Sequence, residues 1–599
     1  MSNFQLSNIE YFVIAGYFVL TITVGIVFKK FSSNTDDYLK SGCKGTWWMV
    51  GTSAFMTAFS AWTFTGAAGM AYTSGFSVMV IFLGNALGYF MNFLFMGPWL
   101  RQMRATTFPE AVAMRYGEGT RYFYAFYEVP LRILFSAVGL YSLGIFCSAV
   151  FGYNINYVIV FCGIVVLIYA ASGGRWAVMA TDFLQGLILV PLTILIAWLC
   201  LDALGGIDGM FREIEAQGLT EDYRIINSGT LFGGAYTWGW ASAMVLKQFI
   251  IFNSMNAAPR YFSVKDGPEA RKAALLAAVL MLVGSVFWFL PPITARLLFD
   301  EQVMALAISK PAEASYAVAS MNLLPVGLIG VMVVAILTAT MSTMDTGLNS
   351  NVAIIIKDIY PKLAYIFKWK PKDETELLRY GRLYTWILGL MIIALALYFA
   401  QQEDRGIFEI MLDVGALLAT PIAVPLLWGM FVRQTPWWAA YMTMAFAFVP
   451  TCFAFFEIPL SYIGFSQQFS DGFVWTFQDK MFSVFGAGSF GFLLSTLFAP
   501  PRDSEHRAKV DAFFSTMKRP VDFEKEIGQG NDLRQLNTVG RFGAAIAGFV
   551  ALMLLIPNPI EGRIAILILA IVIGGISGLM INAGKTKILP ERASVSPEI

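Results

Sequence analysis

The sequence predicts an all-α protein that crosses a membrane many times, and three observations support this fold class. Of the 599 residues, 57% are hydrophobic and only 14% are charged, a composition that fits no soluble globular class. The apolar residues gather in runs of about 18 or more, long enough for a helix to span a bilayer. Short polar connections, several of them rich in Lys and Arg, separate these runs. The chain is therefore expected to be a polytopic helical membrane protein.

Fifteen apolar segments are expected to form membrane helices. They cover residues 9–28, 47–72, 76–99, 124–152, 154–171, 178–203, 236–256, 273–297, 324–350, 383–400, 408–431, 437–457, 480–499, 542–556 and 563–583. Connections on one side carry most of the 41 Lys and Arg residues, including the basic stretch 357–382, whereas 203–235 and 457–479 on the other side carry few. Because positively charged loops remain in the cytoplasm, we predict an N-out, C-in orientation.

Several kinds of chemistry are excluded by the residues that the chain lacks. The sole histidine, His506, falls in a polar loop, so no histidine-based catalysis or zinc site is expected inside the membrane. The five cysteines follow no ligand spacing. There is no GxxxxGK[ST] loop and no kinase signature, so ATP-driven transport and phosphorylation are not expected. Neither a nucleotide nor a nucleic acid is an expected partner. We therefore do not expect an enzyme.

The segment 335–351, AILTATMSTMDTGLNSN, continues the apolar run 326–334 without a turn signal, yet it is rich in oxygen-bearing side chains. On a helix, one stripe holds Ala339, Ser342, Thr343 and Thr346, with Asp345 at its edge. Oxygen ligands without His or Cys suit a hard cation. The alternative is that the hydroxyls bond back to their own helix or join two helices. A carboxylate within the membrane is costly, however, and points to a functional site.

Two of the expected helices carry signs of interruption. In the segment 47–72, Ser60, Thr63 and Thr65 are followed by Gly66 and Gly69, and the helix could unwind there at mid-depth and release backbone carbonyls. Broken helices of this kind form ion and substrate sites. The alternative is a face of small residues that packs closely against another helix. The segment 236–256 ends in FNSMNAAPR and could be interrupted before Pro259 in the same way.

If the second and seventh helices correspond, the chain contains two inverted repeats of five helices each. The predicted parts are 1–46, an extra helix and inside loop; 47–203, the first repeat; 204–235, an outside loop; 236–435, the second repeat; 436–499, peripheral helices; 500–540, a cytoplasmic loop; and 541–599, the last two helices and tail. The outside loop is expected to contain a surface helix in GMFREIEAQG. The charged loop 500–540 is expected to be solvated or regulatory rather than a domain.

Five segments carry motifs in a recognisable order. They are SAWTFTGAAGMAYTSG at 60–75, TFPEAVAMRYG at 107–117, SGGRWAVMATDFLQG at 172–186, PRYFSVKDGPEARKAA at 259–274, and MSTMDTGLNS with KDIY within 341–360. The chain thereby resembles the sodium:solute symporter family, which includes sodium/glucose, sodium/proline and sodium/sialic acid cotransporters. The resemblance covers roughly residues 9–457. It implies a LeuT-type five-plus-five inverted repeat with additional helices, and sodium-coupled alternating access in a cell membrane.

The resemblance also implies where Na⁺, the expected cofactor, would bind. The main sodium site would use the carbonyls of Met56, Phe59 and Ala339 with the hydroxyls of Ser342 and Thr343. Some relatives bind a second sodium ion, and the matching positions here are Asp182, Ser342, Asp345 and Thr346. The alternative for Asp345 is a bond to a neighbouring helix while one sodium ion provides the coupling.

The expected substrate is a small organic solute that is amino-acid-like, a carboxylate or a polyol. The candidate contacts are Ser60, Trp62, Thr63, Lys247 and Asp413. Each has a structural alternative: Lys247 could snorkel or pair with an acid, and Trp62 could simply pack. Arg132 is expected to pair with Glu128 one helical turn away.

Two other functions remain open at this point. The first is a proton-coupled symporter of the same fold, with Asp182 and Asp345 as proton carriers. The second is a solute-sensing membrane receptor with the loop 500–540 as its output.

The motif 107–117 is expected to form a cytoplasmic turn and short helix, with Pro109 at the helix start.

Overall fold

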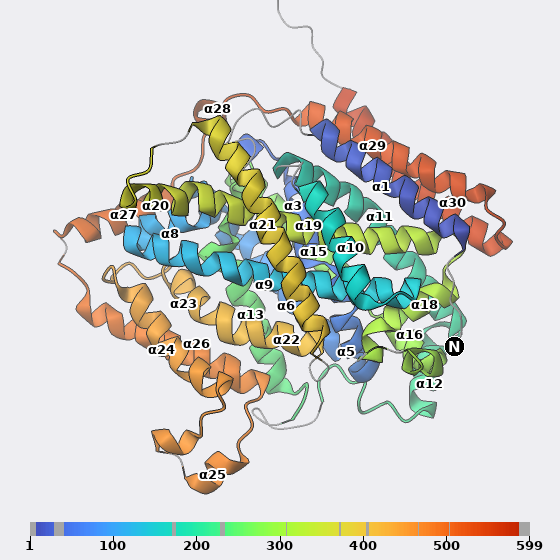
Figure 1. Cartoon of the computed structure of the whole chain (residues 1–599), viewed down its shortest axis with the longest axis horizontal. Coiled ribbons are helices and arrows are strands. Elements are labelled where there is room, and N and C mark those ends of the chain that lie inside the picture. The colour runs from blue at the N-terminus through green and yellow to red at the C-terminus, as the bar shows by residue number, and fades with distance from the viewer. Residues whose placement is uncertain are drawn as a thin grey trace, which may run out of the picture.

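The computed structural model describes residues 7–28, 41–170, 175–227, 234–306, 308, 310–370, 373–402, 406–464, 466–501 and 503–585. Within these ranges every regular element is a helix, and the single β-type contact is an isolated bridge between Gly45 and Val264. The expected all-α class is confirmed. Figure 1 shows long helices crossing the middle of the molecule and shorter ones at its upper and lower edges.

The first half of the chain forms an extra helix and then a set of central helices. Their bounds are α1 (Asn8–Phe28), α3 (Trp47–Ala58), α4 (Ala61–Phe64), α5 (Gly66–Ser74), α6 (Met79–Met91), α7 (Gly97–Gln102), α8 (Phe108–Tyr116), α9 (Glu118–Phe151), α10 (Ile155–Ala170), α11 (Arg175–Ala203) and the surface helix α12 (Gly206–Ala216). A π-helical stretch, Asn92–Met96, joins α6 to α7. The predicted surface helix is confirmed by α12.

The second half of the central region repeats the pattern of an interrupted helix followed by longer ones. Its elements are α13 (Trp238–Asn253), α14 (Ala258–Tyr261), α15 (Gly267–Phe287), α16 (Leu290–Leu298), α17 (Asp300–Met304), α18 (Ser315–Leu323), α19 (Leu328–Ile354), α20 (Tyr360–Ile366), α21 (Glu374–Ala400), α22 (Ile407–Asp413) and α23 (Thr420–Trp428). A π-helical stretch, Val414–Ala419, links α22 to α23.

The remaining helices lie outside the central set. They are α24 (Ala439–Phe455), α25 (Gln467–Gly472), α26 (Phe477–Ser495), α27 (Glu505–Lys518), α28 (Phe523–Glu526), α29 (Asp532–Leu552) and α30 (Ile560–Lys585). In Figure 1, α24 and α26 pack together on the left, while α29 and α30 pack together beside α1 on the right. At the centre, α3 packs against α11, α15 and α19, so these four helices enclose the middle of the protein.

Fewer helices are long and apolar enough to cross a membrane than the fifteen that the sequence predicted. Each of the fifteen expected segments contains helix, but ten helices in the described part of the chain are long and apolar enough to cross a membrane, with two shorter apolar helices besides. One reason is that 47–72 and 236–256 are interrupted, so that α3 has 12 residues and α13 has 16. The count of fifteen and the N-out, C-in orientation stay predictions.

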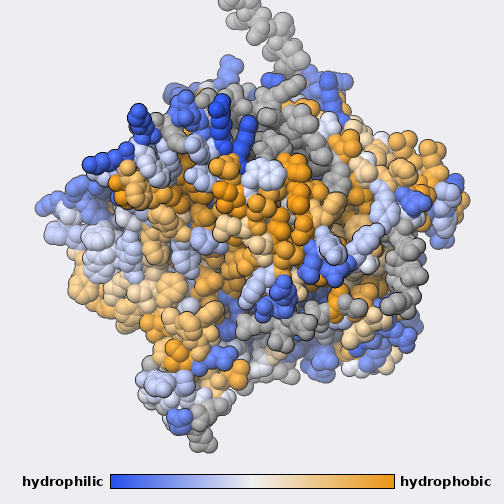
Figure 2. Space-filling model, in the orientation of Figure 1, coloured by the Kyte–Doolittle hydropathy of each residue, from blue (hydrophilic) through white to orange (hydrophobic). Residues whose placement is uncertain are grey.

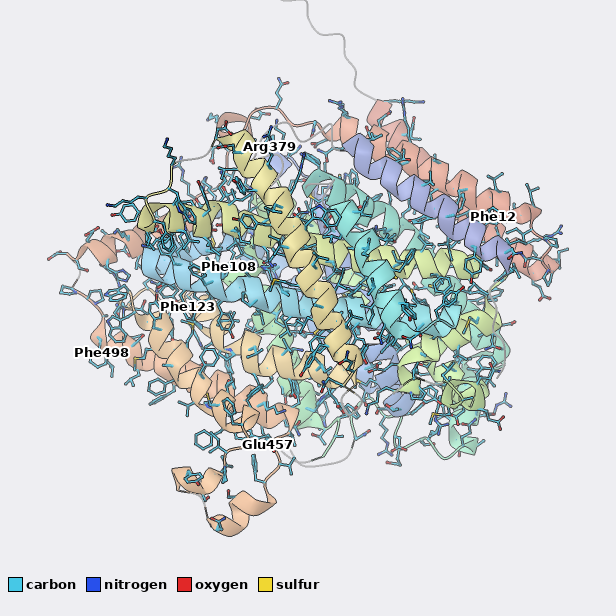
Figure 3. All side chains as sticks on the ribbon, in the orientation of Figure 1. Phe12, Phe108, Phe123, Arg379, Glu457 and Phe498 are labelled. Carbon is cyan, nitrogen blue, oxygen red and sulfur yellow. The ribbon has the colours of Figure 1, made fainter. Side chains whose placement is uncertain are left out.

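An apolar band crosses the face of the molecule that Figure 2 shows. Figure 2 shows hydrophobic residues across the middle of this face and hydrophilic ones along its upper and lower edges. In Figure 3, Arg379 lies near the upper end of α21 and Glu457 lies at the lower edge, on opposite sides of this band. The exposed side chain of Phe12 projects from α1, as an outward-facing residue in a lipid environment would.

Part of the segment 500–540, which was expected to be solvated or regulatory rather than a domain, forms the helix α27 and is not a solvated loop. This helix buries one stripe, Val510, Phe513, Phe514 and Met517, against the rest of the protein. The spacing i, i+3, i+4, i+7 is that of an amphipathic helix, and α27 packs against α7 and α8. Glu526 in α28 forms a two-bond ion pair with Arg104, with both distances 2.8 Å. The segment is therefore attached to the central helices.

The motif 107–117 folds as its sequence predicts. Helix α8 begins after Thr107, whose side chain accepts from the Glu110 amide at 3.3 Å, and the Glu110 carboxylate accepts in return from the Thr107 amide. This capping box, with Pro109 in the first turn, satisfies backbone donors that a helix start leaves without partners. The expected short helix is confirmed.

Candidate functional site

The second expected helix is broken, as the sequence indicated. Helix α3 ends at Ala58, and Phe59 (φ −118°, ψ 97°) and Ser60 (φ −129°, ψ −175°) are extended before the single turn of α4. The backbone N–H of Ala61 finds its acceptor on another helix, since it donates to the Thr340 hydroxyl of α19 at 3.0 Å. Because a helix end leaves its last carbonyls without intrahelical donors, the break exposes backbone oxygen next to α19.

The close-packing alternative for the glycines of this segment also holds. A Cβ atom at Gly66 would lie 2.9 Å from Nε1 of Trp62, and one at Gly69 would lie 3.1 Å from Cγ of Glu313. The glycines therefore allow close approach, while the unwinding occurs at Phe59 and Ser60 and again at Thr65. Both interpretations of the segment apply, at different residues.

The seventh expected helix is interrupted at the predicted place. Helix α13 ends at Asn253, and Ser254 is extended (φ −100°, ψ 170°). The carbonyl of Phe252 accepts from the side-chain amide of Asn92 at 2.8 Å, and the side-chain amide of Asn253 donates to the Gly88 carbonyl at 3.2 Å. Side chains thus satisfy part of this break, whereas the break after α3 borders the hydroxyl-rich helix.

The hydroxyls of α19 divide into two groups. Thr338 donates to the Val334 carbonyl at 2.7 Å, and Thr340 donates to the Ile336 carbonyl at 3.0 Å, as the back-bonding alternative predicts. Thr343 makes a longer bond, 3.3 Å, to the Ala339 carbonyl. The buried hydroxyls of Ser342 and Thr346 make no hydrogen bond to any described residue. The two unbonded oxygens lie one turn apart on a single stripe of the helix.

Two carboxylates lie buried near this stripe. Asp345 accepts from the side-chain amide of Asn349 at 2.8 Å within α19. Asp182 of α11 accepts from the hydroxyl of Ser53 on α3. The bond between Ser53 and Asp182 joins α3 to α11, and α19, which carries Asp345, packs against both helices. Ser53 was not predicted, although it lies one turn before Met56 and Thr57 on the same face of its helix.

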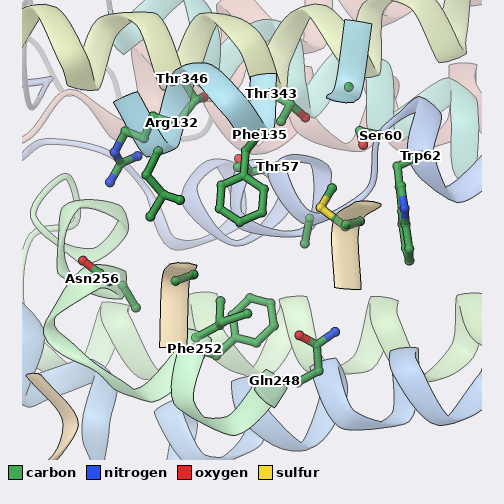
Figure 4. A pocket seen from close by; sticks show the side chains of 18 of the residues that line it. Thr57, Ser60, Trp62, Arg132, Phe135, Gln248, Phe252, Asn256, Thr343 and Thr346 are labelled. Carbon is green, nitrogen blue, oxygen red and sulfur yellow. The ribbon is translucent and has the colours of Figure 1, made fainter. Parts of the chain in front are cut away.

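A cavity of about 350 Å³ opens beside the break in the second helix. Figure 4 shows Ser60 and Trp62 at one end, Phe135 and Phe252 in the middle, and Arg132 with Asn256 at the other end. The hydroxyl residues Thr343 and Thr346 border the cavity, whereas Ser342 does not line it. Two residues of the predicted ion-binding stripe, Thr343 and Thr346, therefore lie in the wall of the cavity.

Three of the five predicted solute contacts line this cavity, namely Ser60, Trp62 and Lys247. Thr63 does not, because it follows Trp62 in the single turn of α4, where neighbouring side chains point about 100° apart. Its buried hydroxyl has no hydrogen-bond partner among the described residues.

Asp413 also lies outside the central cavity. Its carboxylate pairs with Lys480 of α26 at 2.5 Å, at the border of a separate hollow of about 970 Å³. The preceding residue, Leu412, lines the central cavity. A shift of one residue along a helix turns the side chain by about 100°, which accounts for the difference.

The two ends of the cavity differ in chemical character. Around Trp62, the rings of Phe82 and Phe408 are stacked with centroids 6.4 and 6.3 Å away. At the other end, Arg132 pairs with Glu128 at 2.7 Å, as predicted from their spacing. The cavity thus has an aromatic end and a charged end.

Sequence reasoning missed several polar residues of the cavity wall, among them Gln248 and Arg260. The guanidinium of Arg260 donates to the Tyr89 hydroxyl at 2.5 Å and lies over the Phe252 ring, 5.4 Å from its centroid. Gln248 follows Lys247 directly within an apolar helix, and a polar residue in such a helix is itself a signal of function.

The fold and this site define a class of protein, that of helical membrane transporters whose interrupted helices surround a central cavity. Comparisons with known proteins agree. The model of the sodium:solute symporter family matches residues 38–446. The sodium/sialic acid symporter NanT of Aliivibrio fischeri is 24% identical over 441 residues, which are 71% of this chain and 84% of that protein. The sodium/glucose cotransporter of Vibrio parahaemolyticus is 26% identical over 511 residues, 80% of this chain and 90% of that protein.

The structural comparison supports the same fold. A solved outward-open, substrate-bound structure of a Na⁺-coupled sialic acid symporter matches with a TM-score of 0.67 and 20% identity, covering 82% of this chain and 99% of that one. Since the family model spans more than half of the residues, the chain belongs to the sodium:solute symporter family.

Proposed function

We propose that the protein is a sodium-coupled symporter that carries a small polar organic solute across the cell membrane by alternating access. The observation that carries the proposal is the meeting of the α3 break with the unbonded hydroxyls of α19 beside a cavity of about 350 Å³. Interrupted helices that line a cavity are a recurrent way to build coupled ion and substrate sites. Sequence relatives include sodium/sialic acid and sodium/glucose transporters.

The main sodium site in this proposal combines α3 and α19. Its ligands are the carbonyls of Met56, Phe59 and Ala339 and the hydroxyls of Ser342 and Thr343. The Met56 carbonyl lies in the last turn of α3 and receives only a 3.2 Å bond from the Phe59 amide. An all-oxygen set without sulfur or imidazole suits a hard cation. An ion bound there would hold α3 against α19 and favour one conformation over the other.

A second sodium ion is proposed deeper between α11 and α19, with Asp182, Asp345 and Thr346 as its ligands and Ser342 shared with the main site. The two buried carboxylates bring negative charge into the membrane interior, and a cation or a proton between them offsets its cost. Ser53 is proposed as a positioning residue, because its hydroxyl orients the carboxylate of Asp182.

The solute is proposed to occupy the cavity and to contact Ser60, Trp62 and Lys247. The indole nitrogen of Trp62 is buried without a hydrogen-bond partner among the described residues, so its N–H is available to an oxygen of the solute. Each sodium ion that moves inward gains about 2.3 kcal/mol per 100 mV of membrane potential, enough to concentrate a solute.

Uptake into proteoliposomes tests the proposal. Purified protein is reconstituted with an outward-to-inward gradient of NaCl or of choline chloride, and candidate solutes are first chosen by their effect on thermal stability. A ligand of the site raises stability by mass action, and it does so more strongly when sodium is present. Uptake that continues unchanged when choline replaces sodium would refute sodium coupling.

A proton-coupled symporter is the second candidate, and the buried carboxylates of Asp182 and Asp345 favour it. In the same proteoliposomes, a pH gradient without sodium separates the two mechanisms. Accumulation driven by the pH gradient alone would replace the sodium proposal with the proton-coupled one.

A further inference from the structure

Lys247 is a buried cation in the wall of the central cavity. It lies in the interior of α13, and only 7% of its surface is exposed. Its stem packs against Gly415, where a Cβ atom would lie 2.5 Å from Cε of the lysine. Its nitrogen lies 6.0 Å from the centre of the Phe477 ring. Among the described residues, this long contact is the only interaction recorded for the Lys247 nitrogen.

The acidic residues near this region are committed to other partners. In the lining of the cavity the sole carboxylate is that of Glu128, which pairs with Arg132 at 2.7 Å. Asp413 pairs with Lys480 at 2.5 Å. No described carboxylate forms an ion pair with Lys247, although a buried ammonium without a counter-charge is costly. Snorkelling does not explain the residue, since its side chain ends inside the protein.

The cavity as a whole carries an excess of positive charge. Its lining residues include three bases, Arg132, Lys247 and Arg260, and one acid, Glu128, which gives a formal charge of +3 − 1 = +2. Arg260 is bound to a neutral phenol, that of Tyr89, rather than to a carboxylate. A cavity of this charge attracts an anionic solute in a low-dielectric interior.

From these observations we infer that the transported solute carries a carboxylate, and that Lys247 is the residue that binds it. The inference rests on the proposed function and removes simple polyols from its three open solute classes, because carboxylates and amino-acid-like solutes both carry this group. A carboxylate facing Lys247 supplies the missing counter-charge of the ammonium. Beside it, Gln248, Ser60 and the indole N–H of Trp62 are available for the uncharged polar groups of the same solute. The volume, near the lower end for ligand sites, requires a small molecule.

The test compares acids with neutral molecules of nearly the same shape. Purified full-length protein is heated with D-glucuronate or D-glucose, and with D-gluconate or D-sorbitol, each in NaCl and in choline chloride. The expected result is a rise in melting temperature with at least one acid, larger in sodium, and little or none with its neutral counterpart. A neutral molecule that stabilises as well as or better than its acid overturns the inference.

Variants of two lysines identify the residue responsible. Lys247→Met is expected to raise the half-saturating concentration of the stabilising acid by about 30-fold or more, because it removes one partner of a buried charge pair. Lys247→Arg is expected to restore part of the affinity. The matched control is Lys480→Met, which removes a lysine that already pairs with Asp413 outside the cavity and should leave the half-saturation unchanged. Equal half-saturation in wild type and Lys247→Met overturns the inference.

A measurement without solute gives an independent check. Lys247→Met should be at least as stable as wild type, since it removes an ammonium that has no counter-charge, whereas Lys480→Met should be less stable. A large loss of stability in Lys247→Met would reveal a structural partner and count against the inference. If sodium changes neither stability nor uptake, the proposed function fails. If sodium acts normally but the preferred solute is neutral, only the carboxylate inference fails.

Discussion

Removal of the Ser342 hydroxyl should have opposite effects with and without sodium. Ser342 is buried, and its hydroxyl makes no hydrogen bond to a described residue. A buried polar group without a partner costs about 1–3 kcal/mol, so Ser342→Ala should stabilise the sodium-free protein by an amount of this order. With sodium, the same change removes one of five proposed oxygen ligands.

The size of the sodium effect follows from mass action. At a sodium concentration about 100 times Kd, binding stabilises the protein by about 2.7 kcal/mol. If the hydroxyl ligand is worth about as much as a hydrogen bond to a charged group, roughly 1.5–3 kcal/mol, its loss weakens binding by about 10- to 100-fold. For a 100-fold loss, the stabilisation by the same concentration falls to about 0.4 kcal/mol.

Thermal unfolding of the purified variants in a series of NaCl concentrations, with choline chloride holding ionic strength constant, measures both effects. The matched control is Thr338→Val on the same helix, because its hydroxyl already bonds to the Val334 carbonyl and is not a proposed ligand. Thr338→Val should retain the sodium dependence of wild type. If Ser342→Ala also retains it in full, Ser342 does not bind sodium and the proposed main site is incorrect.

Three further predictions concern the second ion, the solute and the buried carboxylate of Glu313. Asp182→Asn and Asp345→Asn should each lower the Hill coefficient for sodium-dependent uptake from about two towards one; a wild-type coefficient of one, unmoved by either change, would eliminate the second ion. Trp62→Ala should raise the half-saturation for the solute with little effect on that for sodium, whereas a parallel loss of both affinities and of expression would indicate a packing role. Burial raises the pKa of Glu313 from 4.5 to about 7, against the opposing hydrogen bond from the Ile407 amide. Because this pKa lies above the unfolded value, the stability contributed by protonated Glu313 is complete below about pH 4.5 and is lost as the pH rises through about 7. The melting temperature should therefore fall more between pH 5 and pH 8 in wild type than in Glu313→Gln. Equal slopes would show that Glu313 does not titrate in this range.

Local features of the sequence were enough to locate the interruptions of the helices. The break at Phe59 and Ser60 and the one at Ser254 both fall in segments where hydroxyl, amide, glycine or proline residues follow an apolar run. Helical hydrogen bonds join residues four apart, so their loss depends mainly on nearby residues. The amphipathic stripe of α27, from Val510 to Met517, was also readable in the sequence, although the charge of the surrounding segment obscured it.

Contacts between helices could not be predicted from the sequence. The sequence alone did not separate Thr338, which bonds to its own helix, from Ser342, which does not, because both are hydroxyls on one helix. It also did not connect Ser53 with Asp182, which are 129 positions apart. Such pairs form only when packing sets the distance and rotation of two helices, and periodicity within one helix does not specify either.

The interrupted helices and the stripe of oxygen atoms on α19 could thus be predicted from local sequence, because each depends on residues within a few turns of one another. Which predicted residues share the cavity depends on the packing of the helices. Packing separates Leu412, in the cavity wall, from Asp413, which pairs with Lys480, and it leaves Lys247 without a carboxylate partner among the described residues. The physical reason is that a side chain's environment is set by the neighbouring helices, which come from distant parts of the chain.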